Sequence, residues 1–239
     1  VGSEMCIRDR AWRLPFGIVA ITGIITFFSV RIWMPRIEAL PDSGLKGQFR
    51  FLSRPAPWLI YSGIFFGQMS VYMWLSYISP IMTSVTGLPE SSMTYIMVVV
   101  GAGMVCGNIV SGKMADRYAP AKVSMVIAAL IVVVMPLIWL LSPYRLPSLI
   151  LAFIAPGLLF GLGGPPQFLI VGYSRGGEML GGAGIQIAFN VSNAVAAAIG
   201  GAIIRHGFGY ASPAIAGVPC AIIAVVAFLI LYRRYPIVE

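Results

Sequence analysis

Three side-chain amides follow one another in an apolar stretch of the chain: Gln186, Asn190 and Asn193. Spacings of four and three residues place all three on one stripe of an α-helix. An amide among apolar groups must find hydrogen-bond partners, so the stripe should face a neighbouring helix or a water-filled cavity. Hydrogen bonding between helices and contact with a bound solute explain the pattern equally well.

A second polar face lies on residues 58–79, where Tyr61, Gln68, Tyr72 and Ser79 are spaced by seven, four and seven residues. A tyrosine ring offers an apolar surface and a hydroxyl, which suits a sugar or an amphiphilic organic solute. Tyrosines also recur at this spacing in ordinary helix packing. The face is therefore a candidate cavity lining, with packing as the alternative.

Prolines and glycines interrupt residues 148–171, first at Pro156–Gly157 and again between Gly161 and Gln167. Proline removes a backbone donor and bends a helix. In a membrane, freed carbonyls are tolerated where they line a cavity or meet a neighbouring helix. We expect the helix to be kinked or broken at these places, and such helices point to a transport site or a hinge.

The elements that position these residues are long apolar runs separated by short polar breaks. The chain is 59% hydrophobic and only 10% charged, with a mean hydropathy of +0.90, which indicates a protein dissolved in lipid. Such runs are too long and too uniformly apolar for barrel strands, so they predict helices. The predicted spans are residues 14–30, 58–79, 93–111, 123–141, 148–171, 180–204 and 212–232. The predicted fold is an all-α integral membrane protein of about seven transmembrane helices.

The net charge of +8 resides between the runs rather than on one soluble face, so we expect no nucleic-acid partner. With residues 1–10 left out, eleven lysines and arginines fall on one side of the membrane and three on the other. The more basic side is predicted to be cytoplasmic, together with the C-terminus.

Away from their ends, the seven runs contain no Asp, Glu, Lys, Arg or His. Cys6, Cys106 and Cys220 have neither metal-ligand nor disulfide spacing. No nucleophile with a base and no phosphate-binding loop is recognisable, so we expect no enzyme activity, no cofactor and no metal site.

The chain divides into four parts by composition. Residues 1–10 resemble a translated sequencing-adapter read-through, so we expect them to be non-native and the natural protein to begin further upstream. Residues 11–34 form one predicted helix. Residues 35–57, rich in proline and basic side chains, form a predicted cytoplasmic linker, and residues 58–239 form a six-helix block.

One motif in the six-helix block indicates a resemblance to a known protein family. Gly112, Asp116 and Arg117, with the basic Lys122 after them, resemble the G-x-x-x-D-R loop signature of the major facilitator superfamily. The pattern departs at Ala119 and Pro120, where the family favours glycine and then a basic residue. Residues 175–190 are similar to the start of helix eleven in arabinose-efflux-type permeases of the drug/proton antiporter group. The resemblance covers about residues 11–232.

The resemblance implies helix six, the central loop and the C-terminal half of a twelve-helix transporter truncated at its N-terminus. Helices seven and ten of that fold line a central cavity. The implied cavity candidates are Gln68, Tyr72, Gln167, Gln186, Asn190 and Asn193. Gly112, Asp116, Arg117 and Lys122 would form a gating loop, in which Asp116 holds a helix end of the opposite half.

The expected function is secondary active transport: proton-coupled efflux of sugars or small amphiphilic organic compounds from a bacterium across its inner membrane. The expected partners are that small-molecule substrate, protons, the lipid bilayer and the missing N-terminal half. The alternative is a non-transporting membrane scaffold or an inactive truncated fragment.

Overall fold

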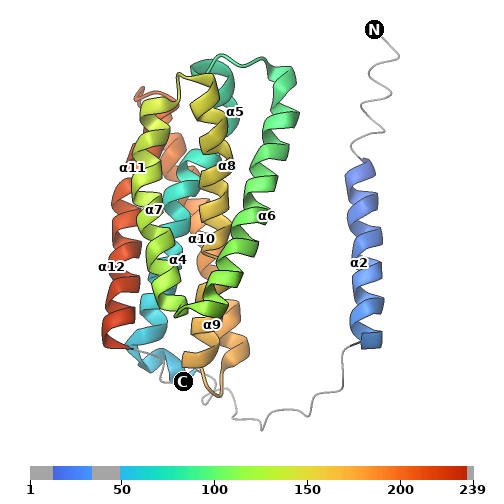
Figure 1. The fold of residues 1–239 in the computed structure, drawn as a ribbon, viewed down its shortest axis with the longest axis vertical. Helices are drawn as coiled ribbons and strands as arrows, with labels where there is room; N and C mark the ends of the chain where they lie inside the picture. Colours follow the sequence, from blue (N-terminus) through green and yellow to red (C-terminus); the bar gives the residue numbers. More distant parts are fainter. Residues whose placement is uncertain (1–12, 34–48, 236–239) are drawn as a thin grey trace. The chain divides into compact units, whose positions relative to one another are not determined.

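The computed structural model describes residues 13–33 and 49–235, which fall into two units (Figure 1). The first unit contributes helix α2 (Arg13–Trp33), whose side chains are exposed from Phe16 to Trp33. Its hydroxyls are satisfied internally, since Thr22, Thr26 and Ser29 each donate to the carbonyl four residues earlier at 2.7–2.8 Å. A helix that is apolar all round and satisfies its own hydroxyls suits a lipid environment.

The second unit is a helical bundle, and the described residues form helices and turns without a strand. Its elements in chain order are η1 (Arg50–Ser53), α4 (Pro55–Leu75), α5 (Ile78–Pro80), the π-helical turn η2 (Ile81–Val85), η3 (Glu90–Ser92), α6 (Met93–Arg117), α7 (Pro120–Leu141), α8 (Arg145–Gly161), α9 (Gly164–Tyr173), α10 (Glu178–Arg205), α11 (Ser212–Ala216) and α12 (Val218–Arg234).

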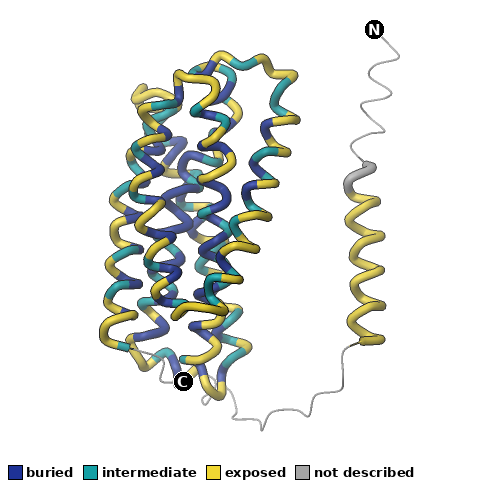
Figure 2. Tube along the Cα trace, in the orientation of Figure 1, coloured by how far each residue is buried: buried dark blue, intermediate teal, exposed yellow. Residues whose placement is uncertain are grey.

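Helix α4 lies in the middle of the bundle, in contact with α10, α12 and four other helices (Figure 1). Buried residues concentrate around it, and Ile60, Ile64, Met73 and Trp74 are at most 2% exposed (Figure 2). The largest apolar side chains therefore occupy the bundle interior, where close packing supplies stability that lipid alone does not.

Six described helical segments are long and apolar enough to cross a membrane: α2, α6, α7, α8 with α9, α10, and α11 with α12. The predicted all-α membrane class is confirmed. Helix α4 is 21 residues long but is not among the six, because its tyrosines, tryptophans and Gln68 lower its hydropathy. Its central position explains this composition, since most of its surface contacts protein rather than lipid.

The helix ends differ from the predicted spans in places. Helix α4 begins at Pro55 rather than at residue 58, and α6 continues to Arg117 rather than ending at residue 111. Proline supplies the helical φ at a first turn, where no backbone donor is needed, which explains the start at Pro55. Residues 1–10 and most of the predicted linker lie outside the described residues.

The helix breaks at one of the two predicted interruptions. Helix α8 ends at Gly161 and α9 begins at Gly164, followed by Pro165 and Pro166. At Pro156–Gly157 the helix does not break, since α8 continues through both residues. One proline removes a single hydrogen bond from a helix, whereas two successive prolines after a glycine pair remove two donors at a point of low helix propensity.

Helices α6 and α8 pack with backbone against backbone. A Cβ atom on Gly103 would lie 2.1 Å from the carbonyl oxygen of Phe153, and one on Gly107 would lie 1.9 Å from that of Gly157. Only glycine fits at either place. The same test at Gly112 finds nothing within 4 Å, so the close approach involves Gly107 and not Gly112.

Candidate functional site

Gln68 lies in the interior of the bundle, where α4 meets the end of α8. Its side chain is fully buried, and its Nε2 donates to the carbonyl oxygen of Leu159 at 3.0 Å. Leu159 is in the last turn of α8, next to the break. Its carbonyl oxygen accepts a long hydrogen bond of 3.3 Å from the backbone amide of Leu162. The Gln68 amide therefore satisfies backbone at the broken helix, as a membrane interior demands.

The Oε1 atom of Gln68 has no hydrogen-bond partner among the described residues, although it is buried. The same holds for Oδ1 of Asn193 on α10. A buried acceptor left unpaired costs about 1–3 kcal/mol. Both atoms are strong acceptors that no described residue satisfies. The Oγ of Ser70 and the Nε1 donor of Trp74, both on α4, are also buried without a partner among the described residues.

Tyr72 links these two amides. It lies one helical turn after Gln68 on α4, and the side chain of Asn193 interacts with its hydroxyl. Its ring meets Phe189 of α10 edge to face, with centroids 5.8 Å apart, and Phe189 meets Phe160 of α8 at 6.5 Å. Three helices thus place aromatic rings and amides side by side, with α8 contributing just before its break.

The other three cavity candidates are exposed. Gln186 and Asn190 continue the stripe of Asn193 along α10, and Asn190 Nδ2 donates to the Gln186 carbonyl at 2.8 Å. Gln167 lies on α9 with its Nε2 against Gly182 of α10, 3.1 Å from the position a Cβ atom would take there. The structure therefore brings Gln68, Tyr72 and Asn193 together and leaves Gln167, Gln186 and Asn190 on accessible surfaces.

The predicted gating loop is mostly helix. Gly112, Asp116 and Arg117 belong to the last turns of α6, and Lys122 belongs to the first turn of α7, with only Tyr118 and Ala119 between the helices. Asp116 is exposed at the C-terminal end of its own helix. The helix dipole disfavours a carboxylate there by about 0.3–1 kcal/mol.

Two tyrosines, Tyr61 of α4 and Tyr77 just after its end, are bonded to the backbone of α10. The hydroxyl of Tyr61 donates to the carbonyl oxygen of Gly181 at 3.0 Å, and that of Tyr77 donates to Ala197 at 2.7 Å. Of the predicted polar face, Tyr61 therefore serves helix packing. The role of Tyr77 was not predicted; the glycines at 184, 200 and 201 of α10, against which both rings pack, are the sequence signal that could have indicated it.

An aromatic pocket of about 410 Å³ adjoins this pair of helices. Five of its lining residues are aromatic. The others are Leu52 and, from α10, one glycine and several apolar residues. Trp58 and Tyr61 meet edge to face in it, with centroids 6.3 Å apart. The aromatic residues are Phe49, Phe51, Trp58, Tyr61 and Phe65.

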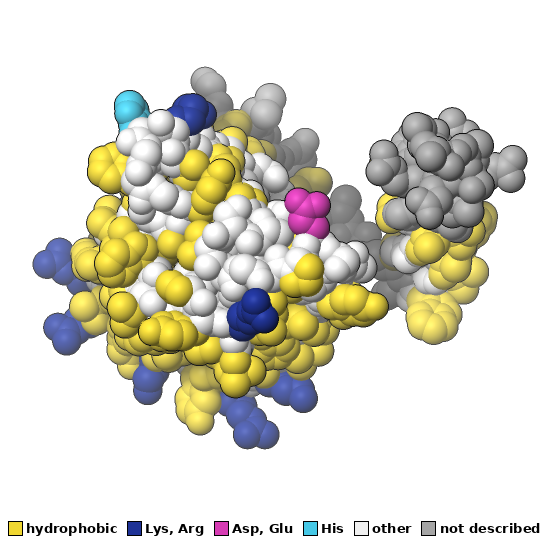
Figure 3. Space-filling view, turned by 90° about the horizontal axis from the view of Figure 1, so that it is seen from above, with side chains coloured by type: hydrophobic (Ala, Val, Ile, Leu, Met, Phe, Trp, Pro, Cys, Tyr) yellow, Lys and Arg dark blue, Asp and Glu magenta, His cyan; other side chains and the backbone are white. Residues whose placement is uncertain are grey.

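Basic side chains gather at one end of the bundle. The end at which α4 begins and α12 finishes carries Arg50, Arg54, Lys113, Arg117, Lys122, Arg175, Arg233 and Arg234. The opposite end carries Arg145 and Arg205. Seen from that opposite end, the surface is mainly apolar or uncharged (Figure 3).

A bundle of apolar helices with buried amides beside a broken helix defines a polytopic membrane protein with a polar interior. The chain matches the model of the Major Facilitator Superfamily over residues 2–183. It belongs to that family of transporters, as the Gly112–Lys122 motif predicted.

Two relatives carry transport names. The chain is 40% identical over 230 residues to "Putative transporter AraJ" of Escherichia coli (strain K12), covering 95% of this chain and 58% of the relative. It is 28% identical over 228 residues to "Inner membrane transport protein YdhP" of Escherichia coli O157:H7, covering 94% of this chain and 58% of the relative. The chain thus spans less than two thirds of the length of these relatives.

Proposed function

We propose that the chain forms helix six and the C-terminal half of a secondary transporter that exports sugars or small amphiphilic organic compounds. Transport would follow from rocking this half against an N-terminal partner half around a central site. The names of the two relatives support transport as the general activity.

The observation that carries this proposal is the pair of buried, unpartnered acceptors, Gln68 Oε1 and Asn193 Oδ1, on either side of Tyr72. A sugar hydroxyl is a donor that would satisfy such an acceptor, and a ring face would stack on the aromatic side chains nearby. Exposed Asn190 and Gln186 on the same stripe, and Gln167 on α9, would extend the contact surface toward the partner half.

Proton coupling requires an ionisable group that can reach both sides of the membrane. The apolar interiors of the spans contain none in this sequence. We therefore assign the coupling acids to the N-terminal partner half. Asp116 takes a different role in this proposal, as the carboxylate that caps a helix N-terminus of that half in one gating state.

We infer further that the protein resides in a bacterial inner membrane with the basic end of the bundle in the cytoplasm. Eight basic side chains at that end against two at the other support this orientation. The C-terminus, which follows α12, would then be cytoplasmic.

The test is export by the full-length gene in cells that lack their own pumps, loaded with labelled sugars and with amphiphilic dyes. We expect at least one compound to leave faster than from cells with the empty vector, and a protonophore to abolish the difference. Normal abundance in the membrane with no export of any compound would favour the non-transporting scaffold instead.

A further inference from the structure

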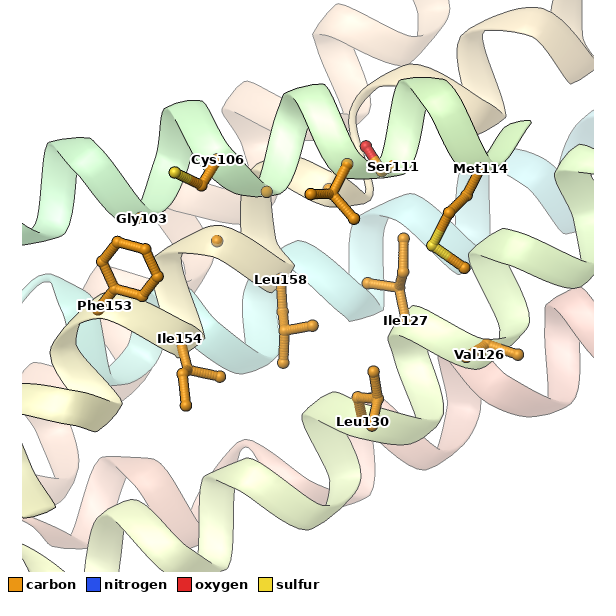
Figure 4. Close-up of a pocket in the computed structure, with 14 residues that line it drawn as sticks. Gly103, Cys106, Ser111, Met114, Val126, Ile127, Leu130, Phe153, Ile154 and Leu158 are labelled. Atoms are coloured by element: carbon orange, nitrogen blue, oxygen red, sulfur yellow. The ribbon is translucent and has the colours of Figure 1, made fainter. Parts of the chain in front are cut away.

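An apolar groove of about 270 Å³ lies between α6, α7 and α8, and none of the three clustered residues Gln68, Tyr72 and Asn193 lines it (Figure 4). Phe153, Ile154 and Leu158 of α8 border it, with Ile127 and Leu130 of α7 opposite. Its rim is accessible, since Val110 is 55% and Leu130 47% exposed.

The groove follows from the glycine packing of α6 on α8. Gly103 and Gly107 of α6 and Gly157 and Gly161 of α8 all line it. Helix α7 packs mainly on α12 and on α8 with α9 rather than on α6. The groove therefore lies beside the backbone contact of α6 and α8, on the side where α7 packs less on α6 than on α8 and α12.

At one end the groove joins a basic pocket. A second hollow of about 520 Å³ shares Val110 and Met114 with the groove and contains Lys113, Arg117 and Tyr118. Spacings of three and four residues from Val110 to Arg117 put apolar and basic side chains on one face of α6. Asp116 lies in the same pocket, so two cations face one carboxylate, and the exposed Lys122 begins α7 beside it.

We propose that this composite site binds an anionic phospholipid, with an acyl chain in the groove and the phosphate at Lys113 and Arg117. An apolar channel that opens to lipid and ends in a net positive pocket matches such a molecule at both ends. A guanidinium holds two phosphate oxygens at once, and a lysine stem can lie along apolar surface while its ammonium reaches the headgroup. The assignment is independent of the transported compound.

The test is native mass spectrometry of the 239-residue chain, purified in mild detergent, with dioleoyl phosphatidylglycerol or dioleoyl phosphatidylcholine. We expect the anionic lipid to be retained more strongly. The double variant K113Q/R117Q should weaken its binding about 30-fold, which converts to about 2 kcal/mol at about 1 kcal/mol per basic residue. The matched control R233Q/R234Q removes two charges from the same end of the bundle and should leave binding unchanged.

The groove is tested separately. Val110→Trp should fill it and weaken binding of both lipids, whereas Val98→Trp, at a 66% exposed position of α6 outside the groove, should not. Equal retention of the two lipids, equal effects of the two charge variants, or full competition by soluble glycerol phosphate would each refute a lipid site. All substituted side chains are exposed, so elution as a single species serves as the folding check.

Discussion

Gln68 and Asn193 each place a strong hydrogen-bond acceptor inside the bundle. Neither acceptor has a donor among the described residues. If these residues served packing alone, leucine at either position would be more stabilising, because it buries no unpaired polar atom. The amide at Gln68 has a structural task through its Nε2, which bonds Leu159, whereas the interaction found for the Asn193 side chain is with the Tyr72 hydroxyl. Asn193 is therefore the better residue at which to separate transport from folding.

Changing Asn193 to Leu should lower export about tenfold. The variant loses one hydrogen bond to the solute, and a loss of about 1.4 kcal/mol corresponds to a tenfold change in affinity. Membrane abundance should stay the same or rise. Export of labelled compound per transporter, quantified by immunoblot, measures this. Asn190→Ala, at an exposed position, should also lower export but by less, and intact export in both variants would make the stripe a packing feature.

Asp116→Asn in the full-length protein should lower export more than it lowers abundance. Losing a contact of up to about 1 kcal/mol changes a gating equilibrium by roughly fivefold without unfolding a bundle. Initial export rates with and without the change give the result. Glu90→Gln, exposed at the opposite end, is the matched control. A similar loss at both positions would remove the special role of Asp116.

At the scale of elements, α6 and α8 form the tightest described pair because their glycines allow backbone contact. Gly107→Ala should cost about 1–3 kcal/mol of bundle stability, since its Cβ would meet the Gly157 carbonyl. Thermal unfolding of the detergent-solubilised protein measures the loss. Gly101→Ala, on the same helix with nothing within 4 Å, should be neutral or stabilising, and the reverse order would refute this packing.

Helix α4 and Tyr77, which follows its end, are joined to α10 differently, through side chains rather than glycine contact alone. Tyr77→Phe removes one hydroxyl donor from the Ala197 carbonyl and should lower stability by about 0.6 kcal/mol, the usual size of such a bond between membrane helices. The same thermal assay detects it as a small downward shift of the midpoint. Tyr95→Phe, at a 75% exposed position of α6, should leave the midpoint unchanged.

The sequence predicts these elements well where one physical term dominates. Long apolar runs located the long helices, because no other structure satisfies a backbone in lipid, although α4 is not among the six described segments apolar enough to cross a membrane. Proline alone did not decide helix continuity: Pro156 is accommodated in α8, while Pro165 and Pro166 follow a break. The stripe rule placed Gln186, Asn190 and Asn193 on one face but not their depth, which depends on how α10 is rotated against α4. Tyr77 was missed for the same reason.

For the whole molecule, the uneven charge of the two bundle ends makes a prediction about topology. In a variant without Cys6, Cys106 and Cys220, a cysteine at Glu90 should react with a membrane-impermeant thiol reagent in intact cells. A cysteine at Arg175 should react only after lysis. Both positions are exposed, so access depends on the membrane side alone. The opposite labelling pattern would show that the bundle has the opposite orientation in the membrane.

The bonds that Tyr61 of α4 and the following Tyr77 donate to α10 also constrain the order in which the protein can be completed. Both join residues 120 positions apart, so the ribosome has made α6, α7, α8 and α9 before the acceptors on α10 exist. Until α10 is made, the two tyrosine hydroxyls lack their acceptors. During that time α4, the long described helix with the lowest hydropathy, is in the bilayer without them. It is then the helix most dependent on insertion factors or chaperones, and a nascent chain stalled before α10 should expose it to quality-control proteases.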